Sequence, residues 1–119
     1  QFPDSEITYK LAVGTVLADV GKPMMLTGTY TMGVATAAAP IQGRLMSFED
    51  RSDQGLGLVG TISQRFITDF PAAAGHGLVV GDMVCGGATS GQVQKVAAGV
   101  YSNNIVVGVV GNTISVSKV

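Results

Sequence analysis

Charged residues are scarce in this chain. Lys and Arg number 7 and Asp and Glu 8, so charged side chains make up 13% of 119 residues, against about 25% in an average domain. The net charge is −1 and no basic cluster is present, which argues against a nucleic-acid partner because phosphates require grouped Lys and Arg. So few charges leave wide neutral areas on the surface, and such areas usually contact another molecule. The composition therefore predicts a protein partner.

Disulfides and long apolar runs are also missing. The single cysteine, Cys85, cannot form an intrachain disulfide, so the fold does not depend on an oxidising compartment, and we expect Cys85 to be a small buried hydrophobic residue. No stretch reaches the roughly 18 apolar residues of a membrane helix, and the apolar run from Val34 to Ile41 is interrupted by Pro40. The sequence predicts no membrane partner.

Glycine is abundant instead. It accounts for 17 of 119 residues, about twice the usual share of roughly 7%, and it separates short β-branched runs, which indicates short strands and many turns. We expect about eight to ten strands and no helix longer than one turn, and hence an all-β fold, a small barrel or sandwich. The length is that of one domain, placed at residues 11–119 after an extended N-terminal arm at residues 1–10.

Several strands can be placed by their patterns. Two strands at residues 41–48 and 56–70 flank a charged turn at 49–54, and a further strand is expected at 14–20. Gly81 and Asp82 predict a hairpin between residues 78–80 and 83–85. The clearest hairpin joins residues 105–110, a continuous apolar run expected to be buried on both faces, to residues 113–119 through Gly111 and Asn112.

The N-terminal segment combines a polar start with an apolar alternation. Phe2 precedes Pro3, and Ile7, Tyr9 and Leu11 recur at period two, as in a strand with one buried face. A strand at a chain end can pair with the sheet edge of another chain, and a frayed terminus is the alternative. The candidate partner-binding residues are therefore Phe2, Ile7, Tyr9 and Leu11.

Four charged residues gather in the central turn. Glu49, Asp50 and Asp53 could offer oxygen ligands to a hard cation, but the spacing matches no EF-hand and Arg51 would repel a cation. A solvated loop or ion pairs between subunits is the favoured interpretation of Glu49, Asp50, Arg51 and Asp53. We predict no metal site.

Two weak motifs suggest chemistry. Gly55, Gly57 and Gly60 spell GxGxxG, but a charged loop precedes them and a β-like segment follows, whereas a dinucleotide site needs a strand and then a helix. His76 and Cys85, with Asp82, supply the residue types of a thiol hydrolase, yet nearness in sequence does not make a triad. We predict no catalytic residue, no cofactor and no enzyme activity.

The overall pattern resembles the head-decoration, or capsid cement, proteins of tailed bacteriophages. The resemblance extends over about Val16 to Val119. It consists of glycine-punctuated strands such as residues 18–23 and 78–84, together with the ending from Ile105 to Val119. It implies a β-tulip type of domain that binds the outside of an icosahedral shell, commonly as homotrimers. It also implies that residues 1–11 extend a strand of the major capsid protein, and it carries no catalytic residues.

This resemblance predicts a structural virion protein, made in the host cytoplasm and located on the outer capsid surface, where it stabilises the shell. One alternative is another β-structured virion module, such as a tail or fibre domain that binds a receptor or carbohydrate. A second alternative is a small-ligand-binding barrel or hydrolase, which predicts an apolar pocket near His76 and Cys85.

Overall fold

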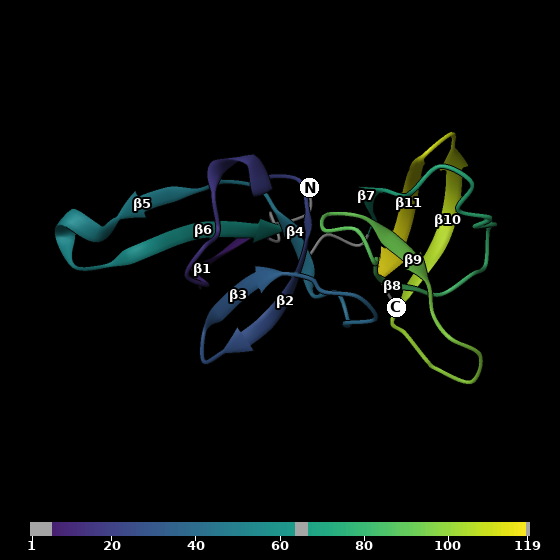
Figure 1. Cartoon of the computed structure of the whole chain (residues 1–119), viewed down its shortest axis with the longest axis horizontal. Helices are drawn as coiled ribbons and strands as arrows, with labels where there is room; N and C mark the ends of the chain where they lie inside the picture. Colours follow the sequence, from purple (N-terminus) through teal and green to yellow (C-terminus); the bar gives the residue numbers. More distant parts are fainter. Residues whose placement is uncertain (1–5, 64–66, 119) are drawn as a thin grey trace, which may run out of the picture.

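The computed structural model describes residues 6–63 and 67–118 and shows an all-β protein with a small closed barrel. This confirms the predicted fold class. Figure 1 shows the barrel in one lobe and a second group of strands in the other. The strands are β1 (Glu6–Leu11), β2 (Pro23–Gly28), β3 (Thr31–Val34), β4 (Gly43–Leu45), β5 (Glu49–Arg51), β6 (Gly57–Ser63), β7 (Ile67–Pro71), β8 (Val84–Gly86), β9 (Val93–Lys95), β10 (Asn104–Val110) and β11 (Thr113–Lys118).

Five strands close the barrel in the order β1, β3, β2, β4 and β6, with β6 pairing back to β1. All neighbours are antiparallel except β1 and β3, which are parallel and meet at Lys10 and Leu11. Closure removes the free sheet edges that a five-stranded open sheet would expose. The second half of the predicted arm is thus β1, a barrel strand, while residues 1–5 lie outside the described residues.

Of the other strands, β5 pairs with the outer part of β6, and the remaining five form two smaller sheets, β10–β11–β7 and β8–β9. Buried hydrophobic residues gather in two clusters, one inside the barrel and one between these sheets. The barrel cluster contains Leu11, Met24, Met32, Leu45 and Ile62. Ala35 and Ile41, which flank the link from β3 to β4, belong to the second cluster, so this link joins the barrel to the smaller sheets.

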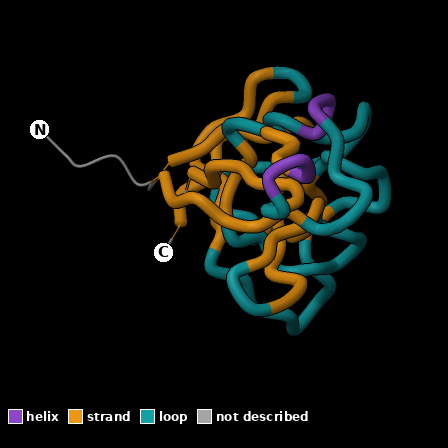
Figure 2. The backbone as a smooth tube through the Cα atoms, turned by 90° about the vertical axis from the view of Figure 1, so that its left-hand side faces the viewer, coloured by secondary structure: helices purple, strands orange, loops and turns teal. Residues whose placement is uncertain are grey.

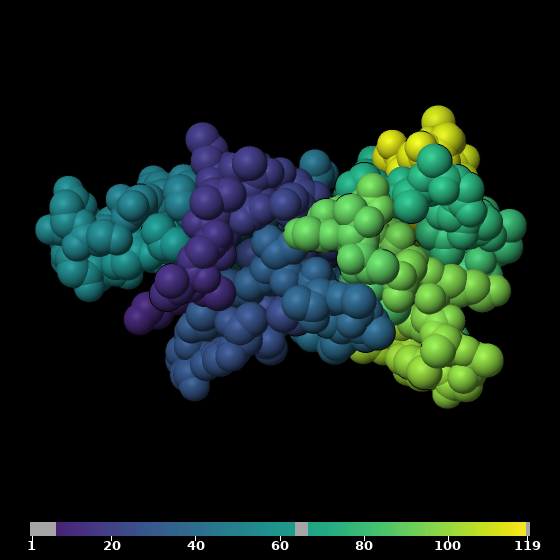
Figure 3. Space-filling view, viewed as in Figure 1, coloured from purple at the N-terminus to yellow at the C-terminus, as the bar shows by residue number. Residues whose placement is uncertain are grey.

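The hairpin β5–β6 leaves the barrel as a projection (Figures 1 and 3). Its tip contains η2 (Ser52–Gln54), a 3-10 turn that ends at Gly55 in the left-handed conformation with φ 74°. Figure 2, which looks along the long axis, shows strands toward one side and most loops toward the other. The projection carries the predicted charged turn away from both clusters.

The C-terminal hairpin forms as predicted, with β10 and β11 paired around Gly111. The expectation that residues 105–110 are buried on both faces is wrong, because Val107, Val109 and Val110 are exposed. The reason is that the β10–β11–β7 sheet packs on the second cluster through one face, and Val106, Ile114 and Val116 already fill that face.

Two local predictions are also wrong. Residues 14–20 form no strand, because the chain turns at Gly14 (φ 98°) and closes the 3-10 turn η1 (Leu17–Asp19). Residues 78–80 do not pair with 83–85. A turn does form at Gly81, but the chain then hydrogen-bonds to β10 through Val106, and β8 pairs with β9 instead.

Candidate interaction surface

Exposed apolar side chains are unusually frequent in this fold. The large exposed hydrophobic residues of the described chain are Ile7, Val13, Val16, Leu17, Val20, Leu26, Tyr30, Met46, Leu56, Ile67, Val79, Val80, Val100, Tyr101, Val107, Val109 and Val110. Isolated exposed apolar residues are normal on a monomer, whereas apolar residues that gather in one place indicate a contact surface.

Four of these residues fall in one segment, between β1 and β2. Val13 is 102% exposed, Leu17 67% and Val16 51%, and Val20 follows at 40%. We call residues 12–20 the apolar loop. Its single charged side chain, Asp19, is buried, so the outward face of the apolar loop carries no charge.

Asp19 holds the apolar loop in place. One carboxylate oxygen accepts the Val16 N–H at 2.9 Å and the other accepts Lys22 Nζ at 2.7 Å. Burial disfavours the charged carboxylate, but the hydrogen bonds from Lys22 and Val16 outweigh it and lower the pKa of Asp19. Thr15 adds a hydrogen bond from its hydroxyl to the Ala12 carbonyl at 2.8 Å. These contacts present the apolar side chains on a constrained backbone, which lowers the entropic cost of binding a partner.

The predicted partner-binding residues of the arm occupy different environments. Phe2 lies outside the described residues, and Ile7 is 47% exposed. Tyr9 packs against the barrel cluster and Leu11 is a buried member of it. Leu11 is therefore a core residue here, because period two along β1 directs it and Tyr9 toward the barrel interior.

At the start of β1, one edge has no partner strand among residues 6–63 and 67–118. β1 pairs with β6 from Glu6 to Lys10 but meets β3 only at Lys10 and Leu11. The Lys10 N–H donates to the Tyr30 carbonyl, on the side away from β6. Because backbone donors alternate sides along a strand, the N–H and C=O of Thr8 also face away from β6. This short edge is available for strand addition.

The four charged residues of the central turn are divided between two elements. Glu49, Asp50 and Arg51 form β5, and Asp53 lies in η2. Arg51 is ion-paired with Glu49 at 2.6 Å. Asp50 accepts hydrogen bonds from the Ser52 hydroxyl and backbone N–H, and both lower its pKa. In the described ranges no three His, Cys, Asp or Glu side chains gather closely enough to hold a metal ion.

The GxGxxG glycines have structural roles. Gly55 and Gly57 have φ of 74° and 71°, values that L side chains rarely adopt. Gly60 lies within β6, and a Cβ on it would be 2.3 Å from the Ser47 carbonyl oxygen. Only glycine therefore fits at this position, where the backbone at Ser47 passes close to β6. The motif continues into the strand β6, whereas a dinucleotide site requires a helix at this place.

The candidate hydrolase residues each have separate partners. His76 Nδ1 accepts the Leu78 N–H at 2.9 Å, so Nε2 carries the proton and donates to the Gly111 carbonyl at 2.9 Å. Asp82 accepts the Val79 N–H and pairs with Lys95 at 3.4 Å. Burial raises the pKa of the Cys85 thiol, the opposite of what a nucleophilic thiolate needs. These contacts join loops and form no catalytic chain.

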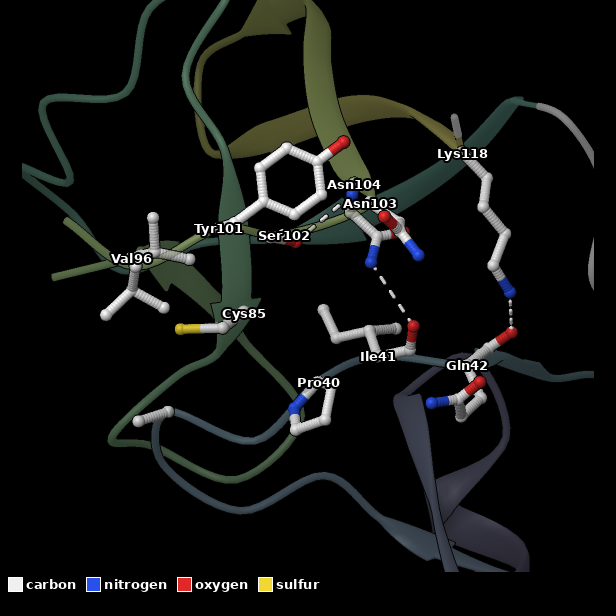
Figure 4. Close-up of a pocket in the computed structure, with 12 residues that line it drawn as sticks. Pro40, Ile41, Gln42, Cys85, Val96, Tyr101, Ser102, Asn103, Asn104 and Lys118 are labelled. Atoms are coloured by element: carbon white, nitrogen blue, oxygen red, sulfur yellow. Dashed lines mark hydrogen bonds between the residues drawn. The ribbon is translucent and has the colours of Figure 1, made fainter.

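A cavity of about 270 Å³ lies between the β3–β4 link and the strands and loops of the second lobe (Figure 4). It is lined by Ala38, Pro40, Ile41, Gln42, Cys85, Val96, Val100, Tyr101, Ser102, Asn103, Asn104 and Lys118. Cys85 lines this cavity and His76 does not. The small-ligand alternative predicts a pocket near both residues, and this cavity is near only one of them. Asn104 Nδ2 donates to the Ile41 carbonyl at 3.2 Å, and Lys118 Nζ donates to the Gln42 carbonyl. We call this the Lys118 cavity.

Sequence reasoning missed the apolar loop and the Lys118 cavity. The one sequence signal for the apolar loop was Asp19 itself. An Asp three residues after Val16 can accept the Val16 N–H and close a local turn. Nothing in the sequence points to the cavity, because Lys118 and its partner Gln42 are 76 residues apart.

Comparison with protein-family models, curated proteins and solved structures finds no match to this chain. No helix in the described ranges has the length and apolar character needed to cross a membrane. The fold and the surface thus define an all-β protein with a rigid apolar loop and an open strand edge.

Proposed function

We propose that this chain is a structural protein of a virus particle, a decoration protein that binds the outside of an icosahedral phage capsid and stabilises it. The observation that carries the proposal is the apolar loop, a charge-free surface held rigid by the buried Asp19. Apolar side chains gathered on a surface are typical of an interaction site. An assembly protein buries such a surface against its partner.

Two further features support this function. The open edge beside Thr8 offers backbone groups to a strand of the shell protein, and Ile7 stands exposed next to it. A decoration protein needs no chemistry of its own, since a ligand that binds only the assembled shell stabilises the shell through its binding free energy. Several linked copies strengthen this effect through effective concentration.

The test is the number of copies of this chain per purified virus particle, measured by quantitative mass spectrometry against the most abundant shell protein. Copy numbers near parity are expected. A few copies per particle would assign the chain to a tail or fibre, and its absence would overturn the virion function altogether.

A further inference from the structure

Within the described part of the chain, the ammonium group of Lys118 has no anionic partner. The side chain is half-buried at the end of β11, and burial lowers its pKa. Nζ donates to the carbonyl of Gln42 (Figure 4), and no ion pair of the described chain involves Lys118. An ammonium removed from water is costly unless a carboxylate pairs with it. Among the described residues no Asp or Glu lines the Lys118 cavity, so Lys118 has no carboxylate partner there.

The walls of the cavity define what would fit beside that charge. Val96, Val100 and Tyr101 supply apolar surface, and Gln42 and Asn103 supply side-chain amides. A short carboxylate next to an aliphatic group matches this combination, because the amides and Lys118 can donate to its oxygens.

One carboxylate of the described chain has no partner. Asp19 is paired with Lys22, Glu49 with Arg51, and Asp82 with Lys95. Asp50 is hydrogen-bonded to Ser52, and Asp69 to Ser115 at 2.6 Å. The side chains of Asp4 and Glu6 are outside the described part. Asp53 remains, exposed at the tip of the projecting hairpin.

The surroundings of Asp53 complement the cavity. Leu56, three residues further along the tip, is 50% exposed and supplies an aliphatic side chain. The tip and Lys118 lie in different lobes (Figures 1 and 3), so Asp53 and Lys118 of one copy cannot meet.

We propose that the Lys118 cavity receives the Asp53 carboxylate of a second copy of this chain, with Leu56 packing on the apolar wall. The contact joins different surfaces of the two copies, head to tail, and such a contact closes into a ring when its rotation permits. This contact would deepen the proposed function. It rests on that function in one respect only, the expectation that the ring is a trimer on a capsid.

A charge swap tests this contact on the isolated chain. The variants are Asp53→Lys, Lys118→Glu and the double variant, and analytical ultracentrifugation measures association. Each single reversal is expected to weaken association by at least about tenfold, and the double variant to restore it, because a buried charge pair tolerates exchange of its partners but not like charges. Circular dichroism of each single variant checks that the loss does not come from misfolding. Lys118→Gln, which removes the charge with little change of size, is expected to weaken association as well.

Two other basic residues of the described chain lack an ion pair and serve as matched controls. Lys10 is exposed on β1, and Arg44 on β4 has a buried Nε without a hydrogen-bond partner. Lys10→Glu is expected to leave association unchanged. Restoration of Asp53→Lys by Arg44→Glu instead of Lys118→Glu would overturn the proposal, as would a wild-type chain that stays monomeric at every concentration.

A covalent test locates the contact directly. Carbodiimide coupling of the wild-type chain joins a lysine amine to a carboxylate that touches it, with the water lost to the reagent. It is expected to give an Asp53–Lys118 amide between copies, which peptide mass spectrometry detects and which Asp53→Asn cannot form. Absence of this cross-link would overturn the head-to-tail contact. This result is independent of capsids, so near-parity copy number with no cross-link would leave the decoration function standing and remove only this inference.

Discussion

The carboxylate of Asp19 lies 2.7 Å from the Nζ of Lys22, three residues along the chain. The pair is largely buried, with side-chain exposures of 11% and 29%, and Asp19 also accepts the backbone N–H of the exposed Val16. A buried charge pair thereby supports an uncharged surface.

Replacing Asp19 by Asn is expected to destabilise the fold by about 1–2 kcal/mol at neutral pH, since the amide loses the charge-assisted hydrogen bond from Lys22. Because the pKa of Asp19 is lowered on folding, its stabilisation is complete above the usual Asp range and is lost as pH falls through and below about 4. Urea unfolding at neutral pH and near pH 3 measures both effects.

Lys10→Gln is the control, since the Lys10 side chain is exposed and has no ion pair in the described chain, and a change within about 0.5 kcal/mol is expected. An Asp19→Asn variant whose stability differs from the wild type equally at both pH values would show that the charge of Asp19 does not hold the loop.

Gly60→Ala is expected to destabilise the barrel by about 2–3 kcal/mol. The new Cβ would lie 2.3 Å from the Ser47 carbonyl oxygen and 3.0 Å from Leu11 Cδ1, and a backbone atom cannot move aside as a side-chain end can. Gly108→Ala on β10 is the matched control, because its Cβ would meet Ser115 Cβ at an ordinary 3.5 Å. Thermal unfolding compares the two, and equal stability would contradict the close packing at Gly60.

Cys85 is expected to be unreactive in the native protein. It is 5% exposed, and burial raises its pKa against opposing hydrogen bonds with Gln94 and the Ala38 backbone. A thiol reagent should therefore label it slowly until urea is added. Cys85→Ala should cost about 1 kcal/mol of stability through lost packing and leave partner binding intact. Rapid native labelling, or an enzymatic activity lost from a folded Cys85→Ala variant, would support the hydrolase alternative.

Thr8→Pro is expected to weaken capsid binding without unfolding the chain. The Thr8 N–H faces the open edge of β1, where proline removes a donor that the barrel does not use. Tyr9→Pro is the control that should unfold the protein, because its N–H points toward β6. Occupancy of undecorated shells, measured by sedimentation, reports the effect.

The same pairing changes how the arm must be tested. Deleting residues 1–10 would remove most of β1 and open the barrel, so lost binding would report unfolding. Deleting residues 1–5 leaves β1 intact. Unchanged occupancy in this deletion and in Thr8→Pro together would remove the N-terminal segment from the binding surface.

Local patterns carry much of the fold. The glycine-separated β-branched runs predict short strands, and the alternation around Gly111 places the last hairpin correctly, because turn chemistry and period two act over only a few residues. The sequence by itself therefore determines an all-β chain with a sparsely charged surface.

Contacts between distant residues decided the rest. The parallel pairing of β1 with β3 closes the barrel, and pairing of β8 with β9 replaces the hairpin expected at Gly81. Neither pairing can be predicted from a short stretch of sequence. Each depends on which distant strands can pack their hydrophobic residues into the same cluster. The cavity beside Lys118 likewise depends on Gln42, 76 residues away, so the sequence could supply the charged residues but only the tertiary structure could show which of them lack a partner.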